Sequence, residues 1–99
     1  MSKEDQKKRG IVAHAWNCGA NDAQIQRIIR EYGYPMMTIP QIAAVRGDIG
    51  LPAWTQINNG PHGSPTDEMI ALARAAAQVL TPQQRTAIAR SRAQMGRNK

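Results

Sequence analysis

Hydrophobic residues in the first half of the chain recur every three or four positions, which is the spacing of amphipathic helices. Each apolar stripe follows a polar capping residue that has Asp or Gln three places on, and each stripe ends at a glycine. These starts and stops predict three helices, running from Ser2 to Gly19, from Asn21 to Gly33 and from Thr38 to Gly50. The third helix proper is expected at 38–49, with Ile42, Val45 and Ile49 on its buried side.

The second half of the chain begins with a polar stretch and continues with two more helical patterns. Residues 53–64 are rich in Pro, Gly and Asn, which predicts a linker or an ordered loop, with Trp54 and Ile57 fastening it to the core. Ser64 and Thr81 each carry a capping signal followed by proline. Two further helices are therefore expected, and the short connection between them predicts a helical hairpin.

The predicted fold class is all-α, packed as one domain. Its parts are a three-helix, helix-turn-helix unit at 1–52, a loop or linker at 53–64, and a C-terminal helical hairpin at 65–99 with a frayed tail.

Composition narrows the class of protein. Hydrophobic residues make up 41% of the 99 residues and aromatic ones only 4%, which suits packed helices better than a sheet. The one cysteine, Cys18, has no partner for a disulfide, and the polar start lacks the apolar run of a secretion signal. No stretch approaches the roughly 20 apolar residues that span a membrane. We therefore expect a cytoplasmic protein that does not enter a membrane.

The net charge favours polyanionic partners but is unevenly distributed. Thirteen Lys and Arg against seven Asp and Glu give +6, which is typical of nucleic-acid binding. Residues 1–63 carry seven basic and five acidic side chains, a net of +2, whereas residues 64–99 carry six basic and two acidic, a net of +4. The charge is densest outside the helix-turn-helix unit.

The first three predicted helices match the plan of a three-helix DNA-binding unit. In such a unit a short turn joins helices two and three, helix one packs across them, and the third helix enters the DNA major groove. The run NDAQIQRIIREYGYPMMTIPQIAAVRGDIGLP resembles the homeodomain-like helix-turn-helix of GcrA-type bacterial regulators and related phage proteins. The resemblance covers roughly residues 7–52 and rests on an aromatic in helix one, a small polar start to helix two, Thr at the cap of helix three and a closing IGLP. It implies a three-helix fold that binds DNA.

Helix three supplies few base-reading side chains, although members of that family usually carry several basic or amide residues there. Gln41 has the geometry to pair with adenine, Thr38 lies beside it, and Ala44 is placed to touch a thymine methyl. The expected phosphate contacts are Lys7, Lys8, Arg9, Arg27, Arg30 and Arg46. An acid-free C-terminal stretch offers a partner or phosphate surface at Arg85, Arg90 and Arg92.

Several residues have plainer interpretations. Lys7, Lys8 and Arg9 also fit a solvated charge run, and the two tryptophans fit packing anchors better than base-stacking groups. His14 and His62 are expected at the surface. No nucleophile with a base, carboxylate pair, phosphate loop or metal-ligand cluster stands at a workable spacing, so we expect no enzyme, no catalytic residue, no metal and no cofactor.

These observations predict a small DNA-binding transcriptional regulator of bacterial or phage origin, with the C-terminal hairpin mediating dimer formation or contact with a partner. The alternative is a protein-interaction module on a helix-turn-helix scaffold, such as an antiactivator or a phage inhibitor of a host protein. The apolar, weakly charged outer side of helix three favours this alternative. A third interpretation, the DNA-recognition part of a phage packaging or recombination protein, shares the same fold.

Overall fold

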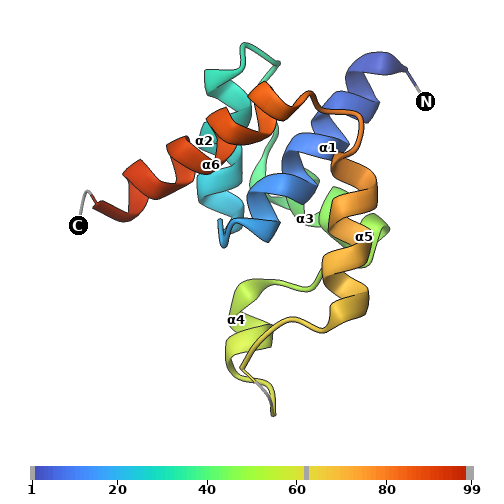
Figure 1. Cartoon of the computed structure of the whole chain (residues 1–99), viewed down its shortest axis with the longest axis vertical. Helices are drawn as coiled ribbons and strands as arrows, with labels where there is room; N and C mark the ends of the chain where they lie inside the picture. The colour runs from blue at the N-terminus through green and yellow to red at the C-terminus, as the bar shows by residue number, and fades with distance from the viewer. Residues whose placement is uncertain (1, 62, 98–99) are drawn as a thin grey trace.

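The computed structural model describes residues 2–61 and 63–97, and these contain six helices and no strand. The helices are α1 (Lys3–Asn17), α2 (Asp22–Glu31), α3 (Ile39–Ile49), α4 (Trp54–Asn58), α5 (Asp67–Ala77) and α6 (Pro82–Arg97). The central helix is α1, which contacts α2, α3, α5 and α6 (Figure 1). The all-α prediction is confirmed. Across the described ranges, no helix has the length and apolarity needed to cross a membrane.

Local capping starts the first three helices where the sequence predicts. The Ser2 hydroxyl accepts a hydrogen bond from the Asp5 backbone N–H at the start of α1. Asn21 and Thr38 each exchange two hydrogen bonds with the glutamine three places on, which forms complete capping boxes for α2 and α3. Thr81 does the same ahead of α6. Because these contacts span only three residues, the sequence alone was sufficient to predict them.

The two C-terminal helices differ from the prediction. The cap of α5 is Thr66, whose hydroxyl accepts from the Met69 N–H, so the helix starts two residues later than expected. The helices α5 and α6 are consecutive but splay apart: α5 packs mainly on α1, and α6 crosses α1 and α2 (Figure 1). The predicted frayed tail lies partly outside the described residues, and α6 continues to Arg97.

Close approach of two backbones explains why α5 lies on α1. Gly10 of α1 is buried, and a Cβ atom there would lie 2.7 Å from Val79 Cγ2 and 3.2 Å from the Ala76 carbonyl oxygen. The facing surface of α5 is also small, with Ala73 and Ala77 buried. Packing between small residues brings α1 and α5 close together. The helix α6 packs on α1 and α2 instead.

Tryptophan packing fastens the segment after α3 to the core, as predicted. Trp54 stacks on Trp16 with ring centroids 5.0 Å apart, and its indole N–H donates to the Trp16 carbonyl at 3.0 Å. The Trp16 indole in turn donates to the Pro52 carbonyl at 2.8 Å. Ile57 is buried. The expected loop is therefore ordered where it is described, and it contains the short helix α4.

Candidate functional site

The outward side of α3 is open to solvent. Ile42 and Ile49 are buried and anchor the helix to the core. The three residues predicted to read bases, Thr38, Gln41 and Ala44, are all exposed. The helix packs on α1 and α2 and meets α5 only at an edge. We call this exposed side, which carries the three residues predicted to read bases, the reading face.

The capping box at the start of α3 also orients Gln41. Its side-chain oxygen Oε1 accepts from the Thr38 N–H at 2.8 Å, and the Thr38 hydroxyl accepts from the Gln41 N–H at 3.2 Å. An amide oxygen has two lone pairs, so capping leaves one of them and both N–H donors of the amide for a ligand. The amide is thus held at the N-terminal end of the helix, the end that meets base edges in such units.

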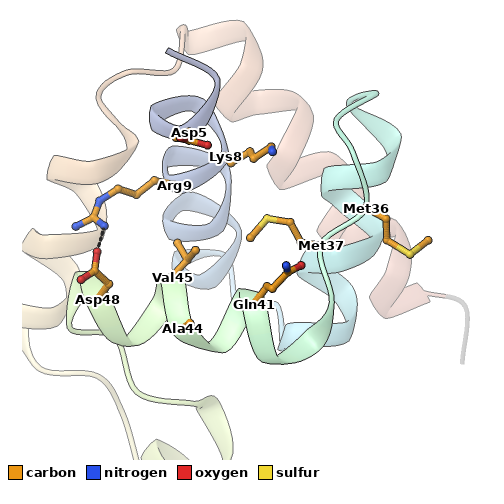
Figure 2. Close-up of a pocket in the computed structure, with 9 residues that line it drawn as sticks. All are labelled: Asp5, Lys8, Arg9, Met36, Met37, Gln41, Ala44, Val45 and Asp48. Carbon is orange, nitrogen blue, oxygen red and sulfur yellow. Dashed lines mark hydrogen bonds and ion pairs between the residues drawn. The ribbon is translucent and has the colours of Figure 1, made fainter. Parts of the chain in front are cut away.

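A groove of about 470 Å³ runs between α1 and α3 beside the reading face (Figure 2). Its lining residues are Asp5, Lys8, Arg9, Met36, Met37, Gln41, Ala44, Val45 and Asp48. Met37 extends from the segment between α2 and α3 toward α1 (Figure 2). Met36 is 63% exposed, the largest exposure among the big apolar side chains of the described residues. The groove thus combines an apolar floor with a rim that carries both signs of charge.

Three of the predicted phosphate contacts are engaged within the fold. Arg46 donates two hydrogen bonds of 3.0 Å to Asp22 and one of 3.0 Å to the Leu51 carbonyl, and its side chain is only 11% exposed. Lys7 donates to the Val79 carbonyl at 2.7 Å. Arg9 pairs with Asp48 at 2.6 Å and so joins α1 to α3 (Figure 2). We therefore leave Arg46 and Lys7 out of the DNA-facing set.

The other three predicted phosphate contacts, Lys8, Arg27 and Arg30, differ in exposure. Lys8 lies 3.4 Å from Glu4, and its side chain is only 19% exposed. Arg27 lies 3.9 Å from Glu31 in an exposed pair, which is weak and exchanges readily for other anions. Arg30 is exposed. Arg27 and Arg30 therefore remain available to contact phosphate, whereas Lys8 is mostly covered.

The three arginines predicted as a C-terminal surface have different environments. Arg90 is exposed, whereas Arg85 and Arg92 are half-buried against other helices. The Arg92 Nε atom is buried without a hydrogen-bond partner in the described structure, and its guanidinium lies near the turn at Gly19. They therefore do not form one continuous exposed patch.

His14 is half-buried and not fully exposed, because α6 packs beside that side of α1. Its Nε2 atom lies 3.1 Å from the Arg85 carbonyl oxygen and 3.7 Å from Cys18 Sγ. Burial lowers the pKa of His14 below its ordinary 6.5, the hydrogen bond with the Arg85 backbone opposes this, and the Arg85 charge lowers it further. The other histidine, His62, lies outside the described residues.

Cys18 sits beside His14 in a half-buried position at the end of α1. Burial raises the pKa of its thiol above the ordinary 9.0, and the nearby Arg92 charge acts in the opposite direction. The thiol therefore stays protonated near neutral pH and is a poor nucleophile. Within residues 2–61 and 63–97, no group of three His, Cys, Asp or Glu side chains could hold a metal ion.

Sequence reasoning missed two parts of this region. The first part is the pairing of Asp22 with Arg46. In the sequence, Asp22 is recognisable only as an acidic residue in the first turn of a helix, and no local pattern links it with Arg46. The apolar groove forms only at the angle that α1 and α3 adopt in the fold. The sequence does not give this angle, so Met36 and Met37 were interpreted only as part of a turn.

Searches of protein-family models, curated proteins and solved structures return no match to this chain. The resemblance to GcrA-type regulators therefore stays a prediction from its residues. What the structure defines is an all-α protein of six helices in its described part, with one side of α3 exposed to solvent.

Proposed function

We propose that this protein is a small regulator that binds duplex DNA with α3 in the major groove. The observation that carries the proposal is the open reading face of α3, with the Gln41 amide held at its N-terminal end. Ala44 and Gly47 are also solvent-accessible, and their small size lets the helix backbone approach the bases closely. The amide would pair with adenine, and Ala44 would touch a thymine methyl.

The charge next to the reading face is compatible with phosphate. Asp48 is the acidic residue on the exposed side of α3, and Arg9 neutralises it through a contact of 2.6 Å. Lys8 lines the wall of the groove opposite Gln41 and pairs with Glu4 at 3.4 Å. Arg27 and Arg30 are exposed on α2, so these two cations would hold the DNA backbone.

The test is selection of a random duplex library by the purified protein at about 150 mM salt, near physiological ionic strength. We expect an enriched motif that contains an adenine read by Gln41. Gln41→Glu keeps an oxygen that caps Thr38 but removes the N–H donors, so preference for that adenine should disappear while the fold remains. Gln83→Glu adds the same charge at an exposed position on α6 and should leave the motif unchanged.

Two outcomes would overturn this proposal. One is the absence of any enriched motif, with only weak binding that vanishes as salt rises. The other is an unchanged motif in Gln41→Glu, which would exclude reading by α3. Arg27→Ala and Arg30→Ala should weaken binding to all sequences alike and reduce the salt slope by about one for each phosphate that the variant no longer touches.

A second candidate function is the recognition of another protein through the groove between α1 and α3. The exposed Met36 favours it, because methionine side chains adapt to varied apolar partners. The occupant would be an amphipathic helix whose apolar side lies on Met37 and Val45. Met36→Glu should abolish such binding while leaving a DNA motif selected by Gln41 intact, so the two functions are separable.

Pairing of two copies belongs to the proposed DNA-binding function. Leu72 and Val79, on and just after α5, are 38% and 40% exposed and offer apolar surface for a second copy. Sedimentation equilibrium with and without the selected duplex tests this. A protein that stays monomeric in both conditions contradicts the dimer and leaves the reading by α3 untouched.

A further inference from the structure

A second hollow, of about 430 Å³, lies among α1, α5 and α6. Its lining residues are His14, Asn17, Arg74, Ala77, Gln78 and Arg85. The polar groups in this lining are two guanidinium groups, two amides and an imidazole, and no carboxylate is among them. We call this hollow the anion pocket.

The two arginines of the anion pocket come from different helices and line the same hollow. Arg74 lies in the last turn of α5, and Arg85 lies in the first turns of α6. Neither guanidinium forms an ion pair within the described residues. Burial is the main cause of the lowered pKa of His14, and the Arg85 charge lowers it further, which places positive charge near the imidazole. An anion between the two arginines would relieve the repulsion of their like charges.

We propose that the anion pocket binds the phosphate group of a small molecule. Guanidinium groups present paired N–H donors that match phosphate oxygens, and the amides of Asn17 and Gln78 add neutral donors at the edge. A space of this size accommodates a compound as large as a nucleotide or a sugar phosphate. The pocket therefore has room for the rest of a phosphorylated compound as well as its phosphate group.

The position of the anion pocket separates it from the proposed DNA contact. Successive residues of a helix are turned by about 100°. On α1, the groove residues Asp5, Lys8 and Arg9 fall on one side, and the pocket residues His14 and Asn17 fall on the opposite side. A duplex seated on α3 therefore leaves the pocket uncovered. For this reason we assign the phosphate to a free compound and not to the DNA backbone.

The first test is a titration of the full chain with pyrophosphate at constant ionic strength. Backbone amide and histidine ring NMR signals report the binding. We expect saturable shifts centred on His14, Asn17 and Gln78. Arg74→Ala and Arg85→Ala should each weaken binding about tenfold or more, because each removes charge-assisted hydrogen bonds. Arg90→Ala removes the same charge from an exposed position on α6 outside the pocket and should change the affinity little.

We expect Arg74→Ala and Arg85→Ala to keep the fold, so weaker binding in these variants reports on the pocket. His14 contacts the backbone oxygen of Arg85, not its side chain, so the helix contact is retained in Arg85→Ala. Arg74→Lys provides a milder change that keeps the charge and loses the paired donors, and it should weaken binding less than Arg74→Ala. Thermal unfolding of each variant checks that the fold is intact.

Three outcomes would overturn the proposal. Shifts that never saturate, or that potassium chloride reproduces, indicate ionic strength alone. Equal weakening by Arg90→Ala indicates a diffuse charge effect. Displacement of pyrophosphate by a short duplex, with matching loss of duplex affinity in Arg74→Ala, assigns the pocket to the nucleic-acid backbone. None of these measurements involves Gln41, so the result stands whether or not α3 reads DNA.

Discussion

The Arg46 guanidinium holds the Asp22 carboxylate through two hydrogen bonds of 3.0 Å, with the two side chains only 11% and 20% exposed. Its remaining terminal nitrogen donates to the Leu51 carbonyl, also at 3.0 Å. One side chain therefore joins the later part of α3 to the first turn of α2 and to the chain that leaves α3. The contact therefore ties α3 to α2 in addition to the buried packing of Ile42 and Ile49.

Asp22→Ala should reduce the free energy of unfolding by about 2 kcal/mol, the usual loss for hydrogen bonds to a charged group. The reason is that the Arg46 guanidinium stays largely shielded from water after its partner is removed. Urea denaturation measures the change. Arg27→Ala, which breaks the exposed pair at 3.9 Å with Glu31, should stay within about 0.5 kcal/mol. Equal losses in the two variants would contradict the role given to Asp22.

Two glycines of α3 should respond to alanine with opposite signs. Gly50 ends the helix at φ 100°, in the left-handed region, and a Cβ there would lie 3.1 Å from Leu72 Cδ1. Gly50→Ala should therefore cost about 1–2 kcal/mol. Gly47 lies inside the helix with nothing within 4 Å of its Cβ position, so Gly47→Ala should add about 0.5–1 kcal/mol. Thermal unfolding of both variants determines the signs, and a stabilising Gly50→Ala would refute the assigned strain.

Helix starts were predictable because their causes are local. The boxes at Asn21 and Thr38 need only the residue itself and a glutamine three places on. The α5 start shows the limit of this reasoning, since Ser64 and Thr66 both offer a capping hydroxyl. The structure uses Thr66, which puts Asp67 and Glu68 in the first turn, where they favour the helix dipole.

Contacts between distant positions were not predictable in the same way. Arg46 and Asp22 are 24 positions apart, and His14 and Arg85 are 71 apart. The apolar pattern did indicate which side of α3 faces outward, because buried Ile42 and Ile49 define the inner side. It gave no angle between helices, so neither the groove nor the splaying of α5 and α6 followed from it.

Trp54 should show a graded response that separates stacking from hydrogen bonding. Trp54→Phe keeps a ring against Trp16 but loses the donor to the Trp16 carbonyl, at a cost of about 1 kcal/mol. Trp54→Ala removes the ring as well and should cost about 3 kcal/mol. Thr55→Ala, at the next and exposed position of α4, is the control and should change little. Circular dichroism under urea measures all three, and equal costs for Phe and Ala would mean that stacking contributes nothing.

The stability of the fold should fall as the pH drops through 6.5, because of His14. Its surroundings are cationic or neutral: Arg85 faces it from α6, Arg74 from α5, and Cys18 from its own helix. Burial, the main cause, lowers the pKa of His14 in the folded chain below 6.5, the ordinary value that it recovers on unfolding. The unfolded chain thus takes up the proton first. The stability contributed by neutral His14 is present above pH 6.5 and is lost as the pH falls toward the folded pKa.

Urea midpoints measured at intervals between about pH 7.5 and 5 follow this loss, in a range where Asp and Glu remain mostly ionised. His14→Gln is the matched variant, because its amide N–H has the reach to donate to the Arg85 carbonyl and does not titrate. The variant should keep a nearly constant midpoint over the same range, while the unchanged protein loses stability. Parallel curves for the two proteins would show that the imidazole is as easily protonated in the folded chain as in the unfolded one. Binding of pyrophosphate in the anion pocket should make the curve of the unchanged protein only slightly less steep, since an anion beside Arg85 offsets the smaller cause of the shift and leaves burial in place.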